Sequence, residues 1–180
     1  ESAMEKLTYI IPLTFIIIFV LIYLALKNMT YTLIIFFTLP FALSGGIIYL
    51  DYLDFNMSIA VVVGFLALLG VAAETSIVML VYLNEAMIEL KQSCLNITKD
   101  EIAKAIYKGA VLRLRPKLMT LFTILGGLIP IMYIHGVGSE VMQRIAAPMI
   151  GGMVTSTFLT LIIIPSIFYI ISIRNSNSTH

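Results

Sequence analysis

Five long apolar runs constrain the fold of this chain more than any other feature of its sequence. Each run approaches or exceeds the ~20 residues with which a helix crosses ~30 Å of hydrocarbon. The runs are continuously apolar, whereas the strands of a lipid-facing barrel would alternate over ~10-residue segments. The sequence therefore predicts an all-α, polytopic membrane bundle, with five transmembrane helices at about 7–26, 28–50, 56–84, 117–134 and 145–173.

Composition excludes a soluble enzyme. Hydrophobic residues make up 60% of the chain and charged residues 12%, and the mean hydropathy is +1.03, which is typical of an integral membrane protein. The chain lacks the P-loop, zinc-protease and nucleophile-elbow motifs, so we expect a protein that is not an enzyme and hydrolyses no ATP. It opens on Glu1, and its short polar lead has no cleavage site. We therefore expect the first apolar run to be a membrane helix rather than a signal peptide, and the chain to be part of a longer protein.

The basic residues orient the expected helices. Lys27 follows the first helix, and most of the other lysines and arginines lie between the third and fourth, whereas Lys6 and Arg144 fall on the opposite side. The positive-inside rule then places the N-terminal end outside and the C-terminal end in the cytoplasm, as five crossings require. Bilayer-proximal positions explain the basic residues without a nucleic-acid partner. The single cysteine, Cys94, cannot form an internal disulfide and would lie on the reducing side.

The polar stretch between the third and fourth runs is long enough to have structure of its own. Thr98-Lys-Asp-Glu101 matches a capping box, and apolar residues then recur at helical spacing with lysines on the other faces. These apolar residues are Ile102, Ala105, Ile106 and Ala110. We expect an amphipathic helix over about residues 98–112, lying on the cytoplasmic surface of the membrane. It would serve as an interfacial connector or, alternatively, as a site of regulation or partner binding.

Small residues cluster inside the apolar runs. The clusters are Gly45-Gly46, Gly70 with Ala72-Ala73, Gly126-Gly127 and Gly151-Gly152. Glycine lets two helix backbones approach closely, so these positions predict helices that pack into one bundle.

Glu74 is a lone carboxylate near the middle of an otherwise uncharged run, where a charge costs a few kcal/mol or more. Lys117 is its candidate partner, because it begins the fourth helix on the side toward which the third helix runs and its long stem can reach inward. Such a pair would form a proton switch, since protonation of Glu74 removes the attraction and changes helix packing. In the alternative, the Lys117 side chain extends to the lipid headgroups, and Glu74 has a structural role in which it is hydrogen-bonded to a neighbouring helix.

Met142 differs from the other methionines because it lies in a polar segment at the outer end of the fifth helix. Most of the ten methionines are explained as flexible filling of an apolar core. A thioether prefers Cu(I) or Ag(I) over hard cations, so Met142 is a candidate metal ligand if a second methionine comes from elsewhere. His135 lies in the same region, where a lone histidine is more often simply solvated.

Three motifs carry a resemblance to a known family. They are Gly70-Val-Ala-Ala-Glu74, Gly109-Ala-Val-Leu-Arg-Leu-Arg-Pro-Lys117 and Gly138-Ser-Glu-Val-Met-Gln-Arg-Ile-Ala-Ala-Pro-Met-Ile-Gly-Gly-Met153. The chain resembles the C-terminal membrane half of the heavy-metal efflux branch of the resistance-nodulation-division (RND) pumps, and within it the copper and silver exporters. The resemblance covers nearly all of residues 1–180 and corresponds to the last five of that family's twelve helices.

The resemblance implies a proton-driven exporter of Cu(I) and Ag(I) in the bacterial inner membrane, with no cofactor. It implies that Glu74 and Lys117 belong to a proton relay and Met142 to a paired-methionine path for the metal. In divalent-metal relatives the position of Glu74 tends to be asparagine, so the glutamate favours monovalent ions.

The resemblance also implies partners that these residues do not contain. A relay aspartate and the main methionine site would come from the missing N-terminal half of the same pump. The pump would be a homotrimer joined to a periplasmic adaptor and an outer-membrane channel. Two alternatives stay open: an RND relative that exports organic amphiphiles, which would not need Met142, and a noncatalytic membrane anchor or assembly subunit.

Overall fold

Each apolar run forms most or all of one helix's apolar length in the computed structural model, which describes residues 2–93 and 98–177. The helices are α1 (Ser2–Leu26), α2 (Met29–Tyr52), α3 (Ile59–Ser93), α4 (Lys99–Tyr133) and α5 (Ser139–Asn177). All five are long and apolar enough to cross a membrane, and the described ranges contain no strand. The predicted all-α bundle of five spanning helices is therefore confirmed. Cys94 lies outside the described residues.

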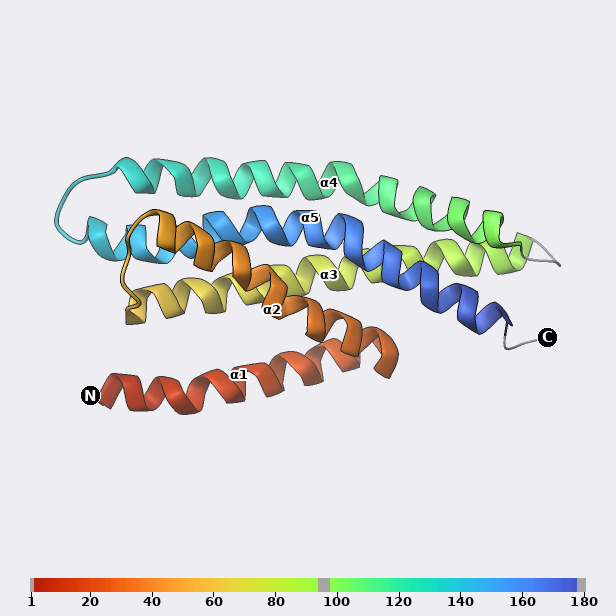
Figure 1. Ribbon diagram of the computed structural model, residues 1–180, viewed down its shortest axis with the longest axis horizontal. Coiled ribbons are helices and arrows are strands. Elements are labelled where there is room, and N and C mark those ends of the chain that lie inside the picture. Colours follow the sequence, from red (N-terminus) through yellow and green to blue (C-terminus); the bar gives the residue numbers. More distant parts are fainter. Residues whose placement is uncertain (1, 94–97, 178–180) are drawn as a thin grey trace.

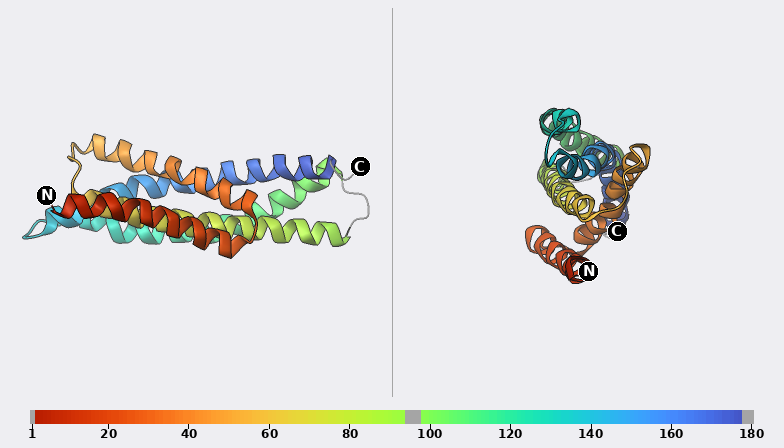
Figure 2. Two further views of the ribbon diagram at one scale, coloured as in Figure 1. Left: turned by 90° about the horizontal axis from the view of Figure 1, so that it is seen from below. Right: turned by 90° about the vertical axis from the view of Figure 1, so that its left-hand side faces the viewer.

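The helices run back and forth along one long axis, so that the two termini lie at opposite ends (Figure 1). The connections from α2 to α3 and from α4 to α5 lie at the end that carries the N-terminus. The end of α3 and the start of α4 lie with the C-terminus. Helix α5 packs against α2, α3 and α4, whereas α1 stands at the edge of the described bundle and contacts α2 and α3 alone (Figure 2).

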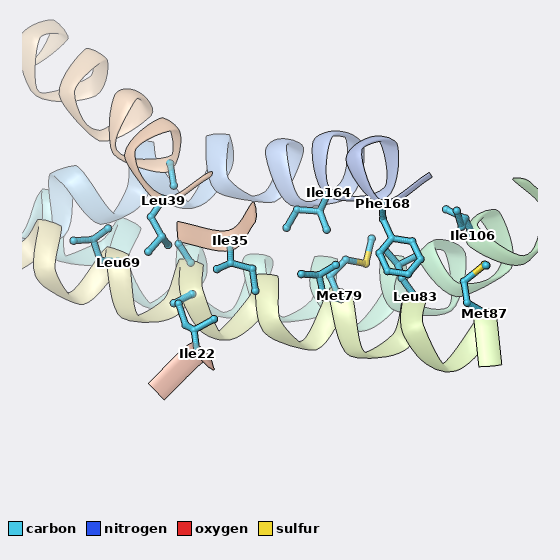
Figure 3. Close-up of a cluster of buried hydrophobic side chains, with 14 of the residues drawn as sticks. Ile22, Ile35, Leu39, Leu69, Met79, Leu83, Met87, Ile106, Ile164 and Phe168 are labelled. Atoms are coloured by element: carbon cyan, nitrogen blue, oxygen red, sulfur yellow. The ribbon is translucent and has the colours of Figure 1, made fainter. Parts of the chain in front are cut away.

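The main apolar core lies where α2, α3 and α5 meet (Figure 3). Ile35 of α2, Leu83 of α3 and Phe168 of α5 are at most 1% exposed there. The outward faces of the helices are also apolar, with Phe37 67% exposed and Phe122 68% exposed. Large apolar side chains on the outside as well as the inside are expected of a bundle whose solvent is lipid.

Glycines bring α2 and α5 into close contact. A Cβ added at Gly45 would lie 2.7 Å from the carbonyl oxygen of Gly151, and one added at Gly46 would lie 2.8 Å from that of Pro148. The hydroxyl of Thr155 donates a hydrogen bond across this crossing to the Ala42 carbonyl, at 3.3 Å. The predicted role of glycine in helix packing is thus confirmed for these two helices.

The prediction is wrong within this chain for three other glycines. Gly70, Gly126 and Gly127 have no atom within 4 Å of an added Cβ. They lie on exposed faces of α3 and α4, so no other helix of the described bundle approaches them.

The expected interfacial helix over residues 98–112 is not a separate element. It forms the first half of α4, which continues without a break from Lys99 to Tyr133. The capping box is present, with the backbone N–H of Thr98 donating to Oε2 of Glu101 at 2.9 Å. The apolar face packs on an extension of α3, and Ile102 and Ile106 join the main core with Leu83. The apolar face of the expected interfacial helix is therefore covered by a neighbouring helix of this chain.

Two further helix boundaries differ from the predicted ones by six residues or more. Helix α3 continues to Ser93 rather than ending near residue 84, because its extension pairs with the start of α4. Helix α5 begins at Ser139 rather than near residue 145, so the polar segment that contains Met142 forms its first turn.

Candidate functional site

Glu74 and Lys117 lie at the same level of the bundle. Each lies near the middle of its helix, and the antiparallel arrangement of α3 and α4 brings the two midpoints together. The sequence predicts Lys117 at the membrane edge, as the first residue of the fourth helix. In the structure it lies near the middle of α4, because α4 begins at Lys99.

A pocket of about 130 Å³ between α3, α4 and α5 contains both residues in its wall. The side chain of Lys117 is 7% exposed, whereas Glu74 is exposed on the surface of the bundle. Burial of Lys117 is the opposite of what snorkelling to the headgroups would produce. The pocket is large enough to hold several water molecules between the two charges.

Three charged side chains line this pocket: Glu74 from α3, and Arg113 and Lys117 from α4. Lys117 is repelled by Arg113 and attracted by Glu74. Among the described residues, neither Arg113 nor Lys117 forms an ion pair with Glu74 within 4.0 Å. Lys108 and Glu89 do form an ion pair, with 3.4 Å between Nζ and Oε1. Glu74 and Lys117 therefore share the pocket without a direct contact, and their proposed role in proton transfer stays a prediction.

Three threonines complete the polar lining of the pocket, one from each helix. The hydroxyl of Thr75 donates to the Val71 carbonyl at 2.9 Å, that of Thr120 to the Pro116 carbonyl at 3.0 Å, and that of Thr160 to the Ser156 carbonyl at 2.7 Å. A hydroxyl has one hydrogen to donate and two lone pairs. Each hydroxyl oxygen therefore has only acceptor capacity left, which suits a cation.

Sequence reasoning missed four of these residues as members of the site. Arg113 and Thr120 lie about one helical turn on either side of Lys117, so helical spacing could have found them. Thr75 follows Glu74 directly and could have been included with it. Thr160 could not have been found, because its position depends on how α5 packs against α3 and α4.

Met142 lies apart from this pocket, in the first turn of α5, and its side chain is 57% exposed. The side-chain amide of Gln143 donates to the Met132 carbonyl at 3.2 Å and to the Ile134 carbonyl at 2.9 Å. These bonds tie the start of α5 to the end of α4 and hold the turn that carries Met142. The described residues contain no cluster of three or more histidine, cysteine, aspartate or glutamate residues that could hold a metal ion.

Comparison with known proteins relates nearly the whole chain to transporters. Residues 1–172 match the AcrB/AcrD/AcrF family. The chain is 50% identical over 177 residues to the putative cation efflux system protein SilA of Salmonella typhimurium and 50% identical over 171 residues to the cation efflux system protein CusA of Escherichia coli (strain K12). It is 35% identical over 168 residues to the cobalt-zinc-cadmium resistance protein CzcA of Cupriavidus metallidurans.

These alignments cover between 93% and 97% of this chain but only 15% to 17% of each relative. An X-ray crystal structure of a heavy metal efflux pump, in its crystal form II, superposes with a TM-score of 0.79 at 33% sequence identity. That superposition covers 95% of this chain and 16% of the solved one. The chain thus spans about one sixth of the length of the proteins that it matches.

Proposed function

Because this chain belongs to the AcrB/AcrD/AcrF family of RND pumps, in its heavy-metal efflux branch, we propose that it is part of a proton-driven exporter of Cu(I) and Ag(I). The observation that carries the proposal is the burial of Lys117 in a pocket shared with Glu74, at mid-height of a bundle of spanning helices. An ionisable pair at that depth is a candidate for moving protons.

The pocket explains how a proton could change the shape of the bundle. When Glu74 is ionised, it attracts the Lys117 ammonium across the pocket. When Glu74 is protonated, the attraction ends while the repulsion by Arg113 persists, so the ammonium moves away and α4 shifts against α3. One charge moving through ~100 mV releases ~2.3 kcal/mol, enough to bias a conformational step of a few kcal/mol without a nucleotide.

The exposure of the α3 face around Glu74 favours a partner helix from outside this chain that covers it. A carboxylate facing lipid is costly, and Gly70, one helical turn before Glu74, has open space around it. We propose that the missing N-terminal half of the same pump covers this face. The assembled protein would be a homotrimer in the bacterial inner membrane, with a cytoplasmic C-terminus, a periplasmic adaptor and an outer-membrane channel.

A soft monovalent metal is the favoured cargo for two reasons. The thioether of Met142 suits Cu(I) and Ag(I). The resemblance also implies that divalent-metal relatives tend to have asparagine at the position of Glu74. The second candidate is a divalent cation, because the 35% identity with CzcA, a cobalt-zinc-cadmium resistance protein, is also substantial.

Everted membrane vesicles that contain the full-length pump test both cargo and coupling. With an acidic lumen, adding Cu(I) or Ag(I) should release protons from the lumen and load the metal into it. Zinc, cobalt and cadmium should produce little of either flux. Larger fluxes with the divalent ions would establish the second candidate, and proton release driven only by organic amphiphiles would exclude a metal pump.

Met142→Leu should lower tolerance of Cu(I) and Ag(I) by roughly tenfold, because one soft ligand is lost while apolar volume is kept. The measurement is growth at graded metal concentrations, with protein amounts compared by immunoblot. Met29→Leu is the matched control, since Met29 is 52% exposed against 57% for Met142 and lies on another helix, at the start of α2. Equal tolerance in the two variants would remove Met142 from the metal path.

A further inference from the structure

Thr160 is the residue through which α5 contributes a polar atom to the pocket of Glu74 and Lys117. Its side chain is 4% exposed, and its hydroxyl hydrogen is used in the 2.7 Å bond to the Ser156 carbonyl. Valine would fill the same volume without a buried polar atom. The hydroxyl is therefore the feature that needs a function.

Thr157 provides an internal comparison one helical turn earlier on α5. It is 3% exposed, and its hydroxyl donates to the Met153 carbonyl at 2.8 Å. The two threonines thus share a helix, a degree of burial and a bond to their own backbone. They differ in that Thr160 lines the pocket and Thr157 does not.

The lone pairs of Thr160 suit a cationic donor. The charged groups that line the pocket are Glu74 from α3 and Arg113 and Lys117 from α4, while α5 contributes Thr160 and Leu161 and no titratable group. An ammonium has three hydrogens to donate and no lone pair. Once Glu74 is protonated, the ammonium needs another acceptor, because an unpaired charge in a buried pocket is costly.

We propose that Thr160 is a positioning residue of the relay, whose hydroxyl oxygen accepts a hydrogen bond from the Lys117 ammonium, directly or through one water, while Glu74 is protonated. This inference rests on the proposed function, in which Glu74 and Lys117 move protons. The Lys117 ammonium would then have two alternative partners, the Glu74 carboxylate on α3 and the Thr160 hydroxyl on α5. Protonation of Glu74 on α3 would thus change a contact of α5, a helix that contributes no charged residue to the pocket. Because α5 also packs against α2, the change could reach that helix as well.

The test uses Thr160→Val in the full-length pump, with proton-coupled metal efflux measured as a function of pH. Without the hydroxyl acceptor, protonation of Glu74 leaves the ammonium unpaired, so a more acidic medium is needed to reach the protonated state. The pH of half-maximal efflux should therefore move to more acidic values by about one unit. Thr160→Ser should restore the original profile, and Thr157→Val should leave it unchanged.

The outcomes separate this inference from the function on which it rests. If Glu74→Gln abolishes efflux while Thr160→Val and Thr157→Val have the same pH profile, Thr160 has no positioning role and the relay stands. If Glu74→Gln leaves efflux intact, the proposed function itself fails. Should Thr160→Val accumulate poorly, Thr160→Ser and Thr160→Ala give the same comparison, because they differ only in the hydroxyl; identical profiles would again overturn the inference.

Discussion

Replacing Glu74 by glutamine is expected to abolish proton-coupled metal efflux by the full-length pump, with a loss of ~100-fold or more. The amide has the shape of the carboxyl group but cannot take up and release a proton. The protein should still accumulate in the membrane, because Glu74 is exposed on the bundle and forms no ion pair with another described residue. Metal tolerance, vesicle proton flux and protein amount are the three measurements.

A cycle of single and double variants identifies the partner of Glu74. Lys117→Met should cause a comparable loss, and the double variant should be no worse than either single one, because two residues that act as one unit have non-additive effects. Glu85→Gln is the matched control, since Glu85 is an exposed carboxylate further along α3 and outside the pocket. Normal tolerance in the Glu74 and Lys117 variants would favour the noncatalytic membrane anchor.

The sequence predicts the number and class of the helices because the bilayer fixes the length of an apolar run. It predicts their ends less well, because nothing in the apolar pattern shows that α3 and α4 extend together beyond the predicted runs at 56–84 and 117–134. That extension depends on Ile102 and Ile106 packing near Leu83. The apolar face of an amphipathic helix indicates only that something apolar covers it. For residues 98–112 the cover is helix α3, whereas the sequence predicts the bilayer.

The sequence likewise predicts only some of the residues of the candidate site. Glu74 can be predicted because it is the lone charge in an apolar run, and Lys117 because it starts the apolar part of the next helix. The pocket itself cannot, since Thr160 enters it through the register of α5 against two other helices. The glycine pattern also fails to show which glycines lie at a helix contact. Gly127 and Gly151 each belong to a Gly-Gly pair in an apolar run, but of the two only Gly151 faces another described helix.

Gly151→Ala is expected to destabilise the bundle by about 1–3 kcal/mol, because overpacking forces a well-packed interface apart. The added methyl group would collide with the carbonyl oxygen of Gly45 and with the side chain of Tyr49. The backbone of α2 cannot yield as a flexible side chain would, so the two helices must separate. The measurement is the temperature at which the detergent-solubilised full-length protein loses its monodisperse peak in size-exclusion chromatography.

Gly127→Ala should have the opposite effect or none. An added Cβ at Gly127 meets no atom of the described residues within 4 Å, and alanine is favoured over glycine in a helix by about 1 kcal/mol. The two variants make the same chemical change in spanning helices, so the contact with α2 is the feature that separates them. An equal loss of stability in both would show that the close crossing of α2 and α5 does not limit the stability of this bundle. A loss at Gly127 alone would instead indicate that a helix from outside this chain packs against α4.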